Sequence, residues 1–400
     1  MLALARVNSA VRLLLMSLAM NNKHLRSSLL VFLFLLAANL VTLRSPASPQ
    51  QPVHLFPILQ NGTWGYIDGA GTIVIKPQFR MAFQFSEGLA PVVVGTKFGY
   101  INQRGEIVVK PQYDEANGFS EGLAVVSKAY RWGYIDRTGK EIIALQFVEA
   151  DDFSQGLAAV RIDTHSADTE SRWGYINKMG DVVIPPRFFS ARRFSEGLAH
   201  VTVGKFGEVH PSGYIDNTGK FVVDPQFMLA GDFAEGVAPV EIGGSYKSFG
   251  ERLWQHVPGK WGYIDRTGKV VIAAQFTGAD EFSEGLALVS VGDKYGYINK
   301  ASQIVVKPKF DYVGNGTYCS SFSEGLACIG LNGKIGYIDT SGKIIAAPQF
   351  DRASQFSNGL AQVAFGGLAP ISREVTDVVA FAGKFAYIDR AGNYVWKPTQ

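Results

Sequence analysis

The sequence is poor in charge, in histidine and in cysteine. Charged residues make up 18% of the 400 residues, which is low for a soluble enzyme, and there are 6 histidines and 2 cysteines. The histidines beyond residue 50 show neither an HExxH pattern nor another spacing typical of metal ligands; they are His54, His165, His200, His210 and His256. A P-loop is absent, and no dinucleotide fingerprint has its strand, turn and helix setting. We therefore predict no metal, no cofactor and no catalytic residue.

A basic surface is also missing from most of the chain. The net charge of +3 arises in residues 1–50, which hold five basic residues and no acidic one, so 33 basic and 35 acidic residues remain, a net of −2. We therefore expect that the part of the chain after residue 50 does not bind nucleic acid. A hydrophobic content of 47% argues against intrinsic disorder, and 44 glycines with 43 Phe and Tyr residues indicate turns and aromatic-rich strands.

The N-terminus reads as a targeting segment, residues 1–47. Lys23 and Arg26 precede 17 uncharged residues, 27–43, that would form a helix of about 25 Å. A basic start, an apolar middle and the small residues 45–47 are typical of a secretory signal cut after Ala47. An uncleaved membrane anchor and a buried segment are the alternatives. With either a signal or an anchor, the body is exported to the periplasm, cell surface or medium. Residues 48–54 are a polar linker.

One short segment recurs nine times and determines the fold prediction. Gly-Tyr-Ile followed by Asp or Asn, with Ala386 replacing Gly once, comes after Trp64, Phe98, Trp132, Trp173, Ser212, Trp261, Tyr295, Ile335 and Phe385. A second block, Phe-Ser-Glu-Gly-Leu-Ala with small variations, begins at Phe85, Phe119, Phe153, Phe194, Phe233, Phe282, Phe322 and Phe356. The glycines of the two blocks are 23 residues apart in seven of eight copies, and the minimal period is 34. The copies fill residues 55–398.

The sequence pattern of each unit predicts three short strands. Leu-Ala-x-Val and Trp-Gly-Tyr-Ile form the first two, and Asp265 to Gly268 exemplifies the turn into the third, where Asp binds backbone amides and Gly takes a positive φ. Proline, as at Pro77, is expected to end the third strand. The aromatic residue two positions later, as at Phe79, and the Phe of the second block are expected to fill the space between units.

Because three strands cannot bury their own apolar face, the units must stack into one all-β array. This array is either an open, superhelical solenoid or a closed propeller. Nine units exceed the usual blade count of about four to eight, which slightly favours the open form.

Residues 260–287 resemble the bacterial WG (KWG) repeat family almost letter for letter, and the resemblance extends over about 55–398. It implies a β-repeat protein, often exported or linked to the cell envelope, whose biochemical role is largely unassigned.

Two recurrent groups have a chemical and a structural interpretation. Ser120 lies in a G-x-S-x-G match, but it belongs to the recurring block and lacks the strand-to-helix setting of a hydrolase. Six glutamates at one position could line a groove, but we favour a role as acceptors of backbone hydrogen bonds at a tight turn; they are Glu87, Glu121, Glu196, Glu235, Glu284 and Glu324.

The tryptophans and the cysteines also have two interpretations each. Packing is favoured over sugar stacking for Trp64, Trp132, Trp173 and Trp261, because Phe, Tyr, Ile and Ser replace them in other units. Trp254 lies in an insertion and is the better candidate for an exposed binding anchor. Cys319 and Cys328 either form a local disulfide after export or remain two free thiols.

Insertions break the 34-residue period near 163–172, 204–211, 243–260 and 365–384, all in one connection, and at 314–319. Insertions on one face of a repeat array commonly build a binding surface, and 243–259 is the first candidate. We predict an exported, non-catalytic protein that binds an envelope protein or glycan. It contacts the membrane only through residues 27–43, and only if this segment is not cleaved. A carbohydrate-active enzyme and a purely structural spacer are the alternatives.

Overall fold

The recurring units form nine small antiparallel sheets, described here as blades 1 to 9. The computed structural model describes residues 54–163, 172–204, 209–248, 254–312, 320–366 and 383–397. The predicted targeting segment 1–47 and residues 48–53 of the linker lie outside the described residues. Within the described ranges, no helix has the length and apolar character needed to span a bilayer.

The strands of blades 1 to 5 follow the order of the chain. They are β1 (Phe56–Gln60), β2 (Thr63–Ile67) and β3 (Ile73–Phe79); β4 (Met81–Ala82), β5 (Leu89–Val94), β6 (Lys97–Asn102) and β7 (Ile107–Tyr113); β8 (Glu115–Ala116), β9 (Leu123–Lys128), β10 (Arg131–Asp136) and β11 (Glu141–Phe147); β12 (Glu149–Ala150), β13 (Ala158–Ile162), β14 (Arg172–Ile176) and β15 (Val182–Phe188); and β16 (Ser190–Ser195), β17 (Leu198–Thr202), β18 (Ser212–Ile215) and β19 (Phe221–Phe227).

Blades 6 to 9 continue this order, with one extra hairpin. They comprise β20 (Val237–Ile242), β23 (Lys260–Asp265) and β24 (Val270–Phe276); β25 (Gly278–Ala279), β26 (Leu286–Val291), β27 (Lys294–Asn299) and β28 (Ile304–Phe310); β29 (Leu326–Leu331), β30 (Lys334–Asp339) and β31 (Ile344–Phe350); and β32 (Arg352–Ala353), β33 (Leu360–Phe365), β34 (Lys384–Asp389) and β35 (Tyr394–Trp396). The hairpin of β21 (Ser245–Ser248) and β22 (Trp254–Val257) lies in the insertion of blade 6.

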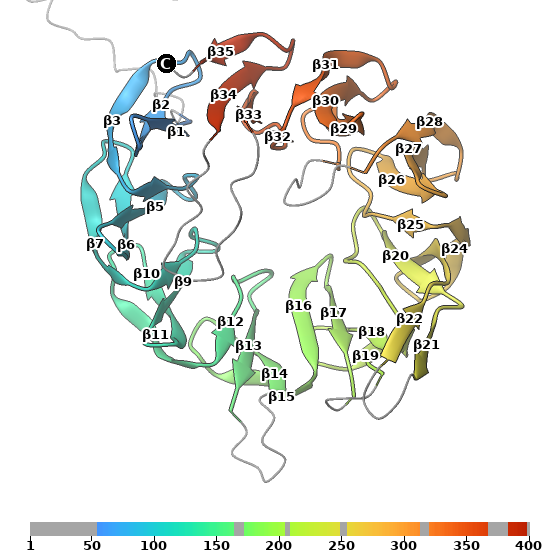
Figure 1. The fold of residues 1–400 in the computed structure, drawn as a ribbon. Helices are drawn as coiled ribbons and strands as arrows, with labels where there is room; N and C mark the ends of the chain where they lie inside the picture. Colours follow the sequence, from blue (N-terminus) through green and yellow to red (C-terminus); the bar gives the residue numbers. More distant parts are fainter. Residues whose placement is uncertain are drawn as a thin grey trace, which may run out of the picture. The chain divides into compact units, whose positions relative to one another are not determined.

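The array is closed, so the slight preference for the open form was wrong. Nine apolar clusters each join two neighbouring blades, and the ninth packs Phe56, Ile58 and Ile67 of blade 1 against Leu360, Tyr387 and Trp396 of blade 9. Figure 1 shows the blades around a ring, with the short strands β12, β25 and β32 towards its centre and β3, β7 and β11 at its rim. The protein is therefore a nine-bladed β-propeller. Its blades include a short inner strand that the sequence pattern did not predict.

The tyrosine of each Tyr-Ile segment links its blade to the next. All nine tyrosines are at most 1% exposed. Each hydroxyl donates a hydrogen bond of 2.7–2.9 Å to a backbone carbonyl of the following blade; the pairs run from Tyr66 with Phe83 to Tyr337 with Ser354. Within the described residues blade 1 has no inner strand, and Tyr387 of blade 9 donates a bond of 2.8 Å to the carbonyl of Pro57 in β1 instead. The same interaction therefore recurs around the ring and closes it.

The glycine of each Trp-Gly pair is required by a bulge in the third strand. The pairing moves from Tyr66 with Ile75 to Trp64 with Phe79, so β3 carries extra residues opposite Gly65. A Cβ atom on Gly65 would lie 2.5 Å from the Ile75 carbonyl oxygen. The expectation that Pro77 ends this strand was wrong, because proline is tolerated at a bulge and the strand continues to the buried Phe79.

The recurrent glutamates accept backbone hydrogen bonds, which is the role favoured from the sequence. The donors, however, belong to the turn of the neighbouring blade. Each Glu-Gly pair has two positive φ values, as at Glu235 (52°) and Gly236 (87°), in a two-residue hairpin turn. The side chain then accepts the glycine N–H of the next such turn, from Glu87 with Gly122 to Glu324 with Gly359, and Gln155 does the same with Gly197.

Glu235 shows the electrostatics of this contact. Burial opposes its ionisation, but the N–H of Gly285 (3.1 Å) and the ammonium of Lys300 (3.1 Å) outweigh burial and lower the pKa of the Glu235 carboxyl. Both partners lie in blade 7. The carboxylate therefore joins two blades rather than forming a binding groove.

Glu235→Ala is expected to reduce the free energy of unfolding by about 1–2 kcal/mol, since it removes a charged acceptor and leaves the Gly285 N–H without it. Glu235→Gln keeps the acceptor, as Gln155 does, and loses the ion pair alone, which costs less than about 1 kcal/mol. Urea unfolding of residues 48–400 measures both values. Equal losses in the two variants would contradict this role.

Candidate functional site

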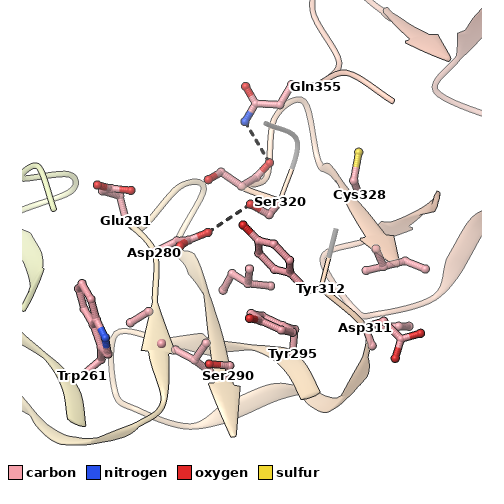
Figure 2. A pocket seen from close by; sticks show the side chains of 17 residues that line it. Trp261, Asp280, Glu281, Ser290, Tyr295, Asp311, Tyr312, Ser320, Cys328 and Gln355 are labelled. Atoms are coloured by element: carbon pink, nitrogen blue, oxygen red, sulfur yellow. Dashed lines mark hydrogen bonds between the residues drawn. The ribbon is translucent and has the colours of Figure 1, made fainter. Parts of the chain in front are cut away.

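A cavity of about 800 Å³ lies between blades 7 and 8. Figure 2 shows its walls, which are mixed aromatic, acidic and hydroxyl-bearing. The labelled lining residues are Trp261, Asp280, Glu281, Ser290, Tyr295, Asp311, Tyr312, Ser320, Cys328 and Gln355. They come from the consecutive blades 6 to 9, so that stacking of neighbouring blades brings them together.

Blade 8 departs from the regular repeat beside the cavity. As in blade 6, where Ala230 bridges Val240, its inner strand is reduced within the described residues to a single bridge between Asp311 and Gly330. The six-residue insertion 314–319 follows this bridge in the sequence and lies outside the described residues. The interruption of the repeat therefore coincides with the cavity.

The aromatic wall consists of two tyrosines and a tryptophan. The rings of Tyr295 and Tyr312 are 5.4 Å apart between centroids and tilted by 37°. Tyr312 is 68% exposed, whereas Tyr295 is half-buried. Trp261 is half-buried and packs against the apolar cluster between blades 6 and 7.

Two carboxylates of blade 7 form the acidic wall. Asp280 accepts a hydrogen bond from the Ser320 hydroxyl (3.2 Å), and Glu281 accepts the N–H of Asp232 (3.0 Å). Burial, reinforced by the charge of Glu281, raises the pKa of Asp280. Asp311 differs, because Lys294 (2.7 Å) and the N–H of Asn332 (2.8 Å) lower its pKa. Asp311 therefore joins the blades, as Asp114 and Asp351 do at the same position with Lys97 and Lys334.

Two further aspartates, Asp152 and Asp232, lie on the inner segments of blades 4 and 6, and arginine partly offsets the rise of their pKa values. Burial raises the pKa of Asp152 and of Asp232, while Arg193 acts on both in the opposite direction. No arginine contributes in this way to Asp280. Among the described residues, Asp280 thus differs from Asp152 and Asp232 in that no basic side chain offsets the effect of burial on its pKa.

The insertion of blade 6 is anchored by a buried carboxylate. Glu241, which is 2% exposed, contacts the His256 ring nitrogen at 2.8 Å and accepts the N–H of Gly259 at 2.7 Å. Trp254, the candidate anchor, begins β22, where its backbone pairs with Ser248. Its side chain lies outside the described part of the structure. The hairpin and the cavity are connected by the short segment that leads from β22 to Trp261.

The remaining sequence candidates serve the fold. Ser120 donates to the Phe153 carbonyl of the next blade (2.8 Å), as five equivalent serines do in theirs. The favoured packing role holds for three of the tryptophans, which are half-buried against the apolar clusters between blades: Trp64, Trp132 and Trp173. Cys328 is disulfide-bonded, and the chain's other cysteine, Cys319, lies outside the described residues. His165 is outside them as well, and the described residues contain no cluster of three or more His, Cys, Asp or Glu that could hold a metal.

The sequence patterns did not identify Asp280, Glu281, Tyr295 or Tyr312 as site residues. The six-residue insertion at 314–319 was the signal that could have located them, because it marks the one unit in which the spacing between the two blocks changes.

Comparison with known proteins supports the repeat and the fold. The family model for the WG containing repeat matches eight tandem segments: 64–97, 98–131, 132–163, 173–205, 213–246, 261–295, 295–334 and 335–368. Each segment supplies the outer strands of one blade and the inner strands of the next. No curated protein matches the sequence.

Solved structures resemble the chain only distantly. A eukaryotic initiation factor is 12% identical, with a TM-score of 0.51 over 77% of this chain and 90% of its own. Kluyveromyces lactis Hsv2 is 9% identical (TM-score 0.36; 70% and 89% covered), and a Mycobacterium tuberculosis puromycin-hydrolyzing peptidase is 11% identical (TM-score 0.37; 78% and 58% covered). The first likeness extends to the fold alone, and the other two carry no argument about function.

Asp280→Asn is expected to stabilise the protein at neutral pH. Because the pKa of Asp280 is raised in the fold, its ionised form disfavours folding, and this penalty is complete above the raised pKa. The advantage of the variant should shrink as the pH falls through that value and vanish below the ordinary pKa of aspartate. Thermal unfolding at several pH values measures it, and an advantage independent of pH would contradict the assignment.

Proposed function

The chain belongs to the WG containing repeat family, and from that premise we propose that it is an exported, non-catalytic propeller that binds a protein or glycan of the bacterial cell envelope. One observation carries the proposal: the recurrent polar side chains bond to neighbouring blades, whereas the irregular positions gather polar and aromatic groups that the repeat does not use. Ser120 and Glu235 exemplify the first class, and Asp280 and Tyr312 the second. A surface of this kind favours binding over structural support alone.

Topology places the irregular positions at one end of the blades. The insertions at 163–172, 204–211, 243–260 and 365–384 all lie in the connection between the first two predicted strands, Leu-Ala-x-Val and Trp-Gly-Tyr-Ile. Ser290 and Tyr295 of the cavity flank the same connection in blade 7. The proposed binding face therefore includes both the insertions and the cavity.

Export is supported by two features. Residues 27–43 have the composition of a signal or anchor, and Cys328 is disulfide-bonded, which is typical of proteins outside the cytoplasm.

The proposal is tested by replacing residues 243–259 with the short connection that blade 2 uses, Gly95-Thr96. Glu241 is changed to Ser in the same variant, because Ser127 and Ser290 occupy this position in blades 3 and 7 and a buried carboxylate would otherwise lose its partners. Residues 48–400 are expected to retain an envelope protein or glycan that the variant retains at least tenfold less.

Tyr130→Ala serves as the control, since Tyr130 is 95% exposed on blade 3, where the connection is short. Thermal unfolding of each protein shows that the fold is kept. Absence of any retained partner, or equal retention by the variant, would contradict binding through this insertion.

A carbohydrate-active enzyme is the second candidate, favoured by the carboxylates of the cavity, of which Asp280 has a raised pKa. Incubation with envelope glycans distinguishes the two: release of new reducing ends, lost in Asp280→Asn, would replace the binding proposal with this one.

A further inference from the structure

The cavity between blades 7 and 8 has a chemistry that identifies a class of ligand. Its volume of about 800 Å³ falls within the range of about 300–1,000 Å³ typical of small-molecule sites. Three of its wall groups, Tyr295, Tyr312 and Trp261, are amphipathic aromatic side chains. The exposed ring of Tyr312 offers a flat apolar face beside polar groups.

The polar groups of the cavity both donate and accept hydrogen bonds. Asp280 and Glu281 are acceptors, whereas the hydroxyl of Ser320 and the amide of Gln355 supply donors as well as acceptors. Gln355 is held in place by a hydrogen bond of 3.3 Å to the Ser321 carbonyl (Figure 2). A ligand with many hydroxyl groups matches such a mixture, since each hydroxyl also donates and accepts.

Charge excludes the other small ligands. None of the described residues that line the cavity is a lysine or an arginine, so phosphates and other anions lack a partner and face Asp280 and Glu281. An ammonium group donates but does not accept, so it could not serve the second N–H of the Gln355 amide, whose first N–H donates to the Ser321 carbonyl. A neutral ligand avoids both costs.

We propose that this cavity binds a neutral saccharide, with one pyranose ring against Tyr312 and its hydroxyl groups hydrogen-bonded to Asp280 and Glu281. This inference rests on the proposed binding function and specifies its ligand class at one site. The carboxylates act here as acceptors for sugar hydroxyls, which form short and strong hydrogen bonds to ionised oxygen.

The test is calorimetric titration of residues 48–400, which include the compact unit His54–Gln400, with defined disaccharides. The neutral probes are maltose, cellobiose, lactose and N,N′-diacetylchitobiose; deacetylated chitobiose is the cationic probe and a uronic-acid disaccharide the anionic one. At least one neutral probe is expected to bind, with affinity reduced tenfold or more in Tyr312→Ala and reduced in Asp280→Asn.

The control is again Tyr130→Ala, which removes an exposed tyrosine from another blade and is expected to leave the affinity unchanged. Binding of no neutral probe, equal affinity in Tyr312→Ala, or binding of the cationic or anionic probe alone would overturn the inference. Retention of an envelope partner depends on residues 243–259, none of which lines the cavity. The proposed function can therefore stand when the saccharide site fails, and the two failures are distinguishable.

Discussion

The hydrogen bond from a buried tyrosine hydroxyl to the next blade is the interaction on which the structure depends. A buried hydroxyl without a partner would cost about 1–3 kcal/mol, so each tyrosine requires a neighbouring blade that presents a backbone carbonyl within reach. Nine blades supply nine such pairs only if the last meets the first, as Tyr387 and Pro57 do. The requirement is local, but satisfying it everywhere closes the ring.

This constraint separates the residues that build the ring from those available for binding. Serine, glutamate and tyrosine of the recurring blocks bond to the next blade, so their repetition reports the needs of the fold. Function is then expected where repetition fails. Over the described ranges, blades 6 and 8 both lack a full inner strand, and blade 6 also carries a hairpin on the buried Glu241. Such departures reduce the free energy of unfolding little when the remaining interfaces between blades are intact.

Local chemistry could be predicted from the sequence, and long-range geometry could not. The turn at Asp265 was correctly predicted because its carboxylate binds the N–H groups of Thr267 and Lys269, all within five residues. Closure was missed because small differences in the angle between blades decide between ring and superhelix, and these angles depend on packing such as Phe79 against blade 2. Pro77 was misread because the bulge that accommodates it depends on Gly65 of another strand. The cavity escaped prediction because four blades contribute its residues.

Hydrogen exchange across the ring tests closure most directly. If blade 9 packs on blade 1, the amides of β1 (Phe56–Gln60) and β34 (Lys384–Asp389) should exchange as slowly as those of β5 and β6 between interior blades. In an open array, β1 and β34 would lie in terminal blades with one covered face each, and their amides would exchange many times faster than those of interior strands. Equal protection is the result that a closed nine-bladed ring predicts, and selective fast exchange in these two strands would contradict it.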